Sequence, residues 1–378
     1  MSLVALAIDA MMPALGVMRE SLGVVKENDI QLVISIVFLG MSFGLMLYGP
    51  LSDAYGRKKA LYLGISIFVL GSLLSILIND FRIVLMGRFL QGFGAAACRV
   101  VSTALIRDKF KGAEMGKIMS LIMVIFIIVP ALAPSVGQLI LFFAPWQGIF
   151  VLFIILGILA LFLLHFKQEE TLPVEKRIPM SYRNILNGVL ETLRNRKTRA
   201  YMIASGLIFG AFVGYLSSAQ QILQVQFNLG KSFTIYFGIL ALFIGISSFI
   251  NSKLVMRFGM EKLALFSLIG LGIVSGIYLF IIKFIFPDVE IYGFLSYLGI
   301  SFLFVGILFG NLNTLAIEPL GHIAGTANSV ISSIQTFLSV GIGGMVGHQY
   351  NGTVIPLVLS FFILSILSII TILLSRVK

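Results

Sequence analysis

Apolar stretches long enough to cross a membrane recur along the whole of this sequence. Each is about 20 residues long, the length that a helix needs to span roughly 30 Å of hydrocarbon. The side chains are 58% hydrophobic and only 11% charged, whereas soluble domains carry about 25% charged residues. No soluble protein of 378 residues can bury so much apolar surface. The chain is therefore predicted to be an all-α membrane protein.

Twelve transmembrane helices are predicted, arranged in two six-helix halves. Their connections are short except for a polar, basic segment at 167–199, whose second part, 182–199, has the apolar spacing of an amphipathic helix on the inner face. This linker separates an N-terminal half, 1–166, from a C-terminal half, 200–378. Residues 252–259 weakly repeat the loop between spans two and three. The expected spans cover 1–18, 30–52, 60–79, 82–106, 117–141, 146–166, 200–225, 232–256, 262–284, 291–315, 324–348 and 352–375.

Lysine and arginine are distributed unevenly between the two sides of these spans. Twenty of the 27 lie in segments that share one side if the even-numbered spans end inside, and five lie on the other side. The excess of basic residues predicts that both termini face the cytoplasm. The remaining two, Arg88 and Arg99, fall within span four. The net charge of +11 is therefore attributed to topology rather than to nucleic-acid binding.

Charged side chains at membrane depth are functional candidates because they cost several kcal/mol unless they are hydrated or paired. Arg88 and Arg99 are eleven residues apart, about 20° past three helical turns, so both are expected to line one water-filled face. Asp9 is the one acid expected well inside a span. The alternative is an internal ion pair that joins spans one and four.

The segment that begins at Gly49 places an acid, a glycine and three consecutive bases between two apolar runs. It fits the pattern G-x-L-x-D-x-x-G-R-K at every defined position and resembles the signature loop of the major facilitator superfamily. The resemblance implies transport by alternating access of two halves. In such a fold Asp53 faces the N-terminus of span eleven, whose helix dipole favours a carboxylate. The implied conformational latch consists of Gly49, Asp53, Gly56, Arg57, Lys58 and Arg107.

Residues 88–96 read R-F-L-Q-G-F-G-A-A and resemble the fourth-helix motif R-x-x-Q-G-x-G-A-A of the superfamily. In proton-coupled members this arginine is implicated in coupling, and a fixed cation lowers the proton affinity of a nearby carboxylate. Residues 9–15 resemble the D-x-x-x-P-A-L stretch of the Bcr/CflA group of drug:proton antiporters. We therefore expect Asp9 to carry the proton, with Arg88 and Arg99 taking part in coupling.

Span five carries two prolines and a glycine, Pro130, Pro134 and Gly137, in a stretch that resembles the fifth-helix motif of antiporters. A proline removes one backbone hydrogen bond and kinks a helix. A kinked helix with small neighbours suits the closing of a cavity, and the resemblance implies export. The alternative is a static kink without a part in transport.

An apolar cavity with few fixed polar groups suits lipophilic substrates that are weakly discriminated. The candidates are aromatic and polar side chains on the inward faces of the spans, although each taken singly also suits a packing role. The predicted cavity residues are Phe38, Gln91, Phe126, Tyr215, Gln220, Tyr236, Asn311 and Gln335.

No catalytic motif occurs, and one cysteine with three scattered histidines offers neither a disulfide nor a metal cluster. The sequence thus predicts a transporter without enzymatic activity, cofactor or metal. The resemblance implies multidrug efflux, by proton antiport, of small hydrophobic drugs across the cell inner membrane, and hence antibiotic resistance. The expected partners are the substrate, protons and membrane lipid, and a monomer suffices. The alternative is an exporter of an amino acid, sugar or siderophore.

Overall fold

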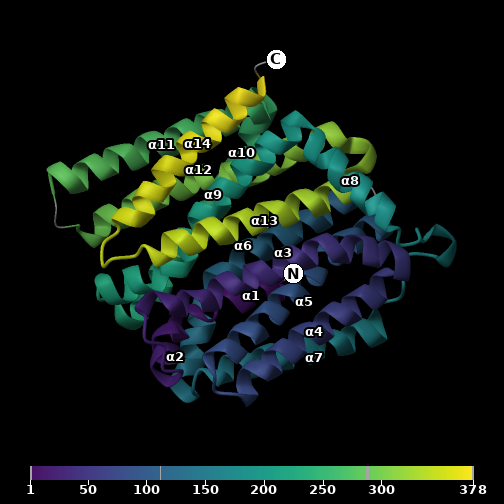
Figure 1. Ribbon diagram of the computed structural model, residues 1–378, viewed down its shortest axis with the longest axis horizontal. Helices are drawn as coiled ribbons and strands as arrows, with labels where there is room; N and C mark the ends of the chain where they lie inside the picture. Colours follow the sequence, from purple (N-terminus) through teal and green to yellow (C-terminus); the bar gives the residue numbers. More distant parts are fainter. Residues whose placement is uncertain (1, 111, 287–288, 377–378) are drawn as a thin grey trace. The chain divides into compact units, whose positions relative to one another are not determined.

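Helices account for every regular element that the computed structural model describes, over residues 2–110, 112–286 and 289–376 (Figure 1). The confirmed all-α architecture follows from uninterrupted apolar runs, in which a helix satisfies every backbone hydrogen bond internally. In chain order the elements are α1 (Ser2–Asp9), η1 (Met12–Ala14), α2 (Leu15–Ser21), η2 (Glu27–Gln31), α3 (Leu32–Tyr55), α4 (Arg57–Leu77), α5 (Phe81–Lys109), α6 (Gly112–Phe143), α7 (Gln147–Lys167), η3 (Val174–Lys176), α8 (Tyr182–Arg194), α9 (Arg196–Ala219), η4 (Gln220–Gln226), η5 (Gly230–Ser232), α10 (Phe233–Phe258), α11 (Met260–Phe284), α12 (Ile291–Ile317), η6 (Glu318–Ile323), α13 (Ala324–His348) and α14 (Ile355–Arg376).

The predicted membrane spans correspond to helices of suitable length. Among the described residues, nine stretches are long and apolar enough to cross a membrane, and one of them, Ile291–His348, contains both α12 and α13. A further apolar segment covers Ile128–Phe143 at the end of α6. With α12 and α13 counted separately, and with α6 and the broken segment before α3 added, the described chain has the twelve expected segments.

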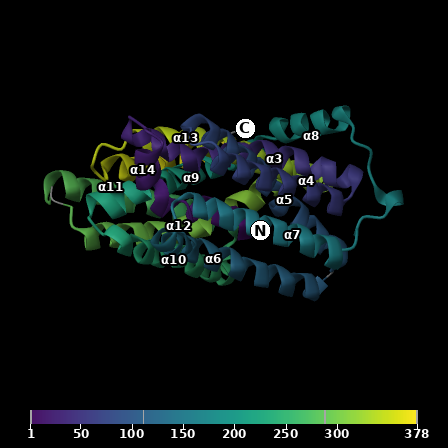
Figure 2. The same ribbon diagram turned by 90° about the horizontal axis from the view of Figure 1, so that it is seen from below.

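The chain divides into two compact units, the first of which contains residues up to Leu190 together with Gly325–Thr336. Within it, α3 and α4 both pack against α5, and α7 packs against α4 (Figures 1 and 2). Glycine permits the closest of these approaches. A Cβ atom on Gly92 of α5 would overlap the backbone carbonyl of Val37 on α3, so the two helices come together almost backbone to backbone.

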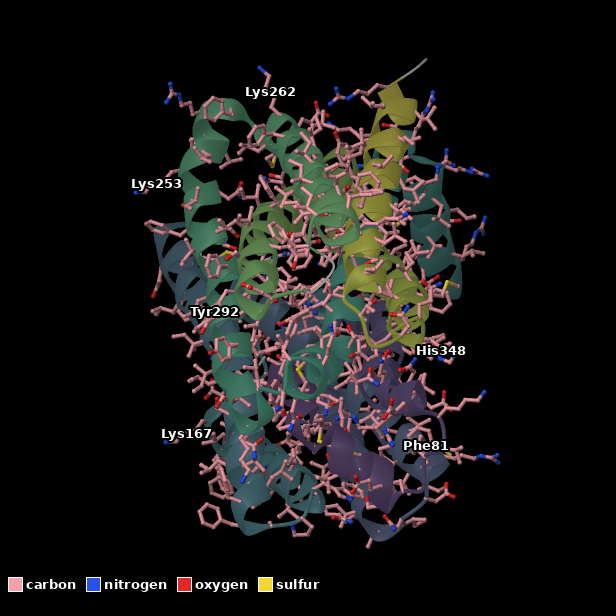
Figure 3. The ribbon with its side chains drawn as sticks, turned by 90° about the vertical axis from the view of Figure 1, so that its left-hand side faces the viewer. Phe81, Lys167, Lys253, Lys262, Tyr292 and His348 are labelled. Atoms are coloured by element: carbon pink, nitrogen blue, oxygen red, sulfur yellow. The ribbon has the colours of Figure 1, made fainter. Side chains whose placement is uncertain are left out.

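The second unit contains Glu191–Ala324 and Phe337–Lys378. In it α9 packs against α12 and α14, while α11 packs against the same two helices and α10 against α12. Figure 3 shows Lys253 and Lys262 at one end of these helices, with Tyr292 and His348 at the opposite end. This separation agrees with the expected inner and outer ends of the spans.

The first membrane segment differs from the single helix predicted over 1–18. It is divided into α1, the short 3-10 turn η1 and α2. The last regular bond of α1 runs from Ala10 N to Leu6 O at 3.1 Å, and Ala14 N then bonds to Met11 O at 3.0 Å. Pro13 explains the break, because a proline has no N–H for the carbonyl of Asp9, four residues earlier.

The linker helix also differs from its prediction, which extended it from 182 to 199. α8 ends at Arg194 and α9 begins at Arg196. Between them Asn195 caps α9, and its side-chain oxygen accepts a 3.0 Å bond from Thr198 N. The amide cap thus starts a new helix inside a segment whose spacing suggested one continuous helix.

The two inner loops predicted to be repeats share a backbone conformation. Gly56 has φ/ψ of 105°/156° between α3 and α4, and Gly259 has 78°/157° between α10 and α11. Residues with a Cβ atom rarely adopt this positive φ. Each glycine therefore permits a turn in which one helix ends and the next begins without a spacer.

Candidate functional site

Asp9 is buried at the end of α1, where the first membrane segment breaks. Only 5% of its surface is exposed. In the described part of the chain, no lysine, arginine or histidine forms an ion pair with it. The predicted alternative, an ion pair between Asp9 and span four, is therefore not formed among these residues.

Arg88 holds the first segment in place through backbone carbonyls. Its Nη2 donates to Ala7 O at 2.6 Å and its Nε donates to Val33 O at 2.9 Å. The last regular helical bond of α1 is accepted by Leu6 O. Arg88 therefore donates to Ala7 O, the next carbonyl along the chain, at the end of the helix. Arg88 is fully buried, and its guanidinium carbon lies 5.9 Å from the centre of the Phe150 ring. One side chain of α5 thus ties together α1, α3 and α7.

Gln91 and Arg99 follow this arginine on α5 but differ in their surroundings. Gln91 accepts a 2.8 Å bond from Arg88 Nη1 and donates at 2.6 Å to Ser72 Oγ. It is fully buried, so it fixes the guanidinium. Arg99 is partly exposed and forms no ion pair with a described residue. The structure therefore does not join Arg88 and Arg99 in one network.

Gly137 brings α6 against the break in the first segment. A Cβ atom at this position would overlap the carbonyl oxygen of Ala10 and lie 3.1 Å from Pro13 Cγ. Pro130 and Pro134 lie earlier in α6, which continues as one helix through both. The fifth-helix motif thus contacts the residues next to Asp9, a proximity that neither motif reveals in the sequence.

Arg57 is the centre of a second cluster, at the junction of α3 and α4. Its guanidinium pairs with Asp53 through Nη1 and with Asp108 through Nε at 3.0 Å. Nη1 also donates to Ser52 Oγ at 2.7 Å. Asp108 lies near the end of α5, so this arginine connects the signature loop to α5.

Glu170 fastens the linker to the same loop by capping the start of α4. Its Oε1 accepts a 2.9 Å bond from Arg57 N, and its Oε2 accepts a 3.1 Å bond from Lys58 N. A Cβ atom on Gly56 would overlap Oε2, so glycine leaves the space that the carboxylate occupies. A carboxylate at a helix N-terminus is also favoured by the helix dipole.

The pKa of Glu170 reflects two opposing effects. Burial alone raises the pKa of this carboxyl, but backbone N–H donors outweigh it and lower the pKa below the ordinary value of 4.5. These donors are those of Leu172, Arg57, Lys58 and Thr171. The charged form of Glu170 is therefore the form that holds the linker.

Of the remaining predicted latch residues, two make contacts and one does not. Lys58 Nζ donates to His165 O at 3.1 Å. A Cβ atom on Gly49 would lie 2.6 Å from Ser329 Oγ of α13, so this glycine permits close packing there. Arg107 is exposed and forms no ion pair with a described residue, and its neighbour Asp108 makes the contact instead.

Sequence reasoning missed Asp108 and Glu170. The available clue to Glu170 was an acidic pair, Glu169-Glu170, directly after span six in an otherwise basic linker. Asp108 directly follows Arg107, which the sequence analysis placed in the latch. Which of two adjacent charges turns toward a neighbouring helix depends on the packing of that helix.

A Glu170→Gln variant is expected to loosen the linker and lower the thermal unfolding midpoint in detergent. The neutral amide keeps one acceptor oxygen, but its NH₂ group cannot accept the bond from Lys58 N. Glu169→Gln is the matched control, because no hydrogen bond to the side chain of this exposed neighbour is seen among the described residues. Equal midpoints for the two variants would contradict the capping role.

The same pair of variants gives a pH test. Because folding lowers the pKa of Glu170, its contribution to stability is complete above the ordinary pKa of 4.5 and is lost as the pH falls through the lower folded-state value. The midpoint difference between wild type and Glu170→Gln should therefore shrink on acidification. A difference that grows as the pH falls would overturn the assignment.

The predicted cavity residues are distributed over both units. Phe38 and Gln335, like Gln91, are buried in the first unit. The side chain of Phe126 lies outside the described residues. The contacts described for these positions do not join them into one site, so their substrate role stays a prediction.

In the second unit, Tyr215 belongs to an aromatic cluster. Its ring stacks on Phe237 at 5.8 Å between centroids and meets Phe302 edge-on at 4.9 Å. Phe212 contacts Tyr215 and Phe302 as well, with centroids 6.1 and 5.7 Å away. These rings come from α9, α10 and α12, so Tyr215 packs these helices together.

The other three predicted residues of the second unit have separate neighbours. Gln220 opens the π-helical turn η4 and donates to Gln224 Oε1 at 3.0 Å. Asn311 Nδ2 donates to Asn251 Oδ1 at 2.8 Å, which links α12 to α10. Tyr236 is partly exposed on α10. A π turn is often found at functional sites, which keeps Gln220 a candidate.

A charged cluster that the sequence did not predict lies at the end of the second unit that is predicted to be the inner one. Glu261, at the start of α11, accepts a 2.8 Å bond from Tyr201 Oη. It also pairs with Lys197 at 3.6 Å and with Arg376 at 3.4 Å. Lys197 in turn contacts Glu318 at 3.0 Å. The cluster fastens the ends of α9, α11 and α14 to one another.

The described residues form twelve apolar segments, with a buried carboxylate in the first of them and a charged loop between helices. These features define a multi-pass membrane protein. A family model for the Major Facilitator Superfamily matches residues 1–344. The chain therefore belongs to the Major Facilitator Superfamily, as the signature loop indicated.

Related sequences align over most of the chain. YdgK, an uncharacterized MFS-type transporter of Bacillus subtilis, is 32% identical over 372 residues, covering 96% of this chain and 90% of the relative. A bicyclomycin resistance protein homolog of Haemophilus influenzae is 29% identical over 364 residues, covering 93% and 90%. The multidrug resistance protein MdtL of Salmonella paratyphi C is 28% identical over 353 residues, covering 91% and 86%. The names of the last two relatives agree with the resemblance to the Bcr/CflA group.

Solved structures share the fold at low sequence identity. The human organic anion transporter MFSD10 matches with a TM-score of 0.74 and 16% identity, covering 99% of this chain and 96% of that one. A D-xylose–proton symporter matches with a TM-score of 0.71 and 15% identity, covering 100% and 95%. At such identities the likeness establishes the fold alone.

Proposed function

We propose that this protein exports small hydrophobic drugs across the cell inner membrane in exchange for protons, by alternating access of its two halves. The observation that carries the proposal is Asp9, an acid buried in the first membrane segment without an ion-pair partner among the described residues. The names of the relatives, which refer to bicyclomycin and multidrug resistance, supply the substrate class.

An unpaired buried carboxylate suits exchange chemistry. Ionisation of Asp9 in a closed, apolar surrounding is costly, so the acid favours its protonated form there. Hydration or a polar substrate favours the charged form and releases the proton. The backbone bonds of Arg88 and the close contact of Gly137 fix the segment that carries Asp9. Arg88 is thus proposed to act on coupling by positioning α1.

The other assignments complete the proposal. Both termini and the 167–199 linker lie on the cytoplasmic side, and a monomer performs the cycle. The cluster of Arg57 with Asp53 and Asp108 stiffens the inner end of the N-terminal half, so that this half moves as one body. The predicted cavity residues, Tyr215 and Gln220 among them, line the substrate path.

Asp9→Asn tests the coupling step. Everted vesicles that contain the wild type should release protons when drug is added under an imposed proton gradient, and the variant should lose this response. The response is lost because the asparagine amide cannot take up and release a proton as the Asp9 carboxyl group does. Glu20→Gln is the control, since this acid is exposed on α2 of the same segment.

Retained drug-dependent proton movement in Asp9→Asn would refute the role of Asp9. Growth protection against a panel of antibiotics tests the substrate class separately. Proton coupling without protection against any drug would favour export of a metabolite, the alternative that the relatives' names do not support.

A further inference from the structure

The linker helix α8 leaves one edge of its apolar stripe uncovered. A Cβ atom on Gly188 would lie 2.6 Å from Thr326 Cγ2, so this side of α8 contacts α13 closely. Thr192, one turn further on, is fully buried. By contrast, Leu186 and Leu190 are each 41% exposed. A surface helix usually buries its apolar stripe, whereas in α8 Ile185, Val189 and Leu193 are only half-buried and the two leucines at the edge of the stripe are exposed.

Basic residues border the uncovered leucines on one flank. At 100° per residue, Arg183 and Arg194 lie about 60° and about 80° from Leu186 around the helix, beyond Leu190 on the same side. Neither arginine forms an ion pair with a described residue. The one acid of α8, Glu191, lies further round and bonds to His322 Nε2 at 2.6 Å.

The chain that leads into α8 adds exposed apolar side chains. Ile178 is 62% exposed and Met180 is 44% exposed. The backbone of this segment is bonded to the rest of the protein, because Ile178 N donates to Asp53 O of the signature loop at 3.1 Å. In Figure 1, α8 crosses the direction of α3 and α4, two membrane helices of the first unit. The apolar side chains are thus presented on a segment anchored to the protein.

We propose that the face of α8 formed by Leu186, Leu190, Arg183 and Arg194 binds the surface of the bilayer through anionic phospholipid headgroups. Helices with an apolar stripe and a basic border lie in the membrane interface, where leucines enter the acyl boundary and arginines meet phosphates. Charge complementarity selects anionic lipid: residues 167–199 hold eight bases and four acids. The lipid thereby holds the linker against the membrane, independently of what the protein transports.

The test places a fluorescent probe on either side of the helix. Cys98 is the one cysteine of the chain and is buried, so an introduced cysteine can be labelled selectively. Leu190→Cys carries the probe on the proposed face, and Asn187→Cys carries it on an exposed position about 60° further round, beyond the arginine flank. Both proteins are reconstituted in nanodiscs of phosphatidylcholine, with or without phosphatidylglycerol, that contain lipid spin-labelled near the headgroup.

Lipid quenching is expected to be stronger at position 190 than at 187, and it should increase with phosphatidylglycerol. Replacing Arg183 or Arg194 with glutamine should weaken this quenching about fivefold per arginine, the factor typical of a base near an anionic surface. Equal quenching at 187 and 190, or no response to phosphatidylglycerol, would overturn the proposal. If the probe at position 190 is not quenched by lipid but its signal changes with protein concentration, the face would instead be assigned to contact with a second copy of the chain.

Discussion

A Gly137→Ala variant is expected to lose transport and to unfold at a lower temperature than the wild type. The added methyl group would overlap the carbonyl oxygen of Ala10 at the break in the first membrane segment. Because the methyl carbon is bonded directly to the backbone of α6 and the oxygen belongs to the backbone of Ala10, α6 must move away from the first segment. Overpacking of this kind costs about 1–3 kcal/mol, and the displaced segment carries Asp9. Thermal unfolding in detergent and drug efflux from vesicles measure the two effects.

Two other membrane glycines provide the control for this substitution. Gly310 on α12 and Gly344 on α13 have open space where a Cβ atom would be placed. Alanine there should leave transport intact and the unfolding midpoint unchanged or slightly raised, because alanine favours a helix over glycine. If Gly137→Ala behaved like these controls, the close contact between α6 and the first segment would be refuted.

An Arg88→Leu variant is expected to be the most destabilising single change in α5. It removes the donors to Ala7 O and Val33 O and also the donor to Gln91 Oε1. Each buried polar group left without a hydrogen bond costs about 1–3 kcal/mol. Arg88→Lys should rescue only part of the loss, since an ammonium group lacks the planar fork that reaches several acceptors. The measurements are the unfolding midpoint and the yield of monodisperse protein.

Arg82→Leu is the matched control, because Arg82 lies on the first turn of the same helix and is exposed. Its midpoint should stay close to that of the wild type. If Arg88→Leu unfolded at the wild-type temperature but lost proton coupling, the positioning role would be wrong, and a direct electrostatic effect of Arg88 on Asp9 would replace it.

The order of the helices follows from local properties of the sequence. The lengths of the apolar runs predicted the bounds of several helices. For example, α13 spans 324–348 as predicted, and α12 begins at the predicted residue 291. Glycine at 56 and 259 marked the turns that require positive φ. The first segment was mispredicted because its hydropathy is continuous across Pro13, although the missing N–H of proline breaks the helix there.

The site was predictable in its residue types but not in its partners. Asp9 stood out because acids are rare at membrane depth, and it is indeed buried. The partners of Arg88 are carbonyl oxygens, which every residue carries, so no pattern of side chains identifies them. The same holds for Glu170, whose partners are backbone N–H groups at the start of α4.

The sequence by itself determined that the chain spans a membrane many times, that it belongs to a transporter superfamily, and where most helices begin and end. These properties depend on composition and on spacing along one segment. Only the tertiary structure decided that Gly137 and Arg88 hold the break beside Asp9, that Asp108 rather than Arg107 joins the loop cluster, and that α8 leaves its leucines uncovered. Such contacts join residues that are far apart in the chain, and they form only where packed helices bring those residues within bonding distance.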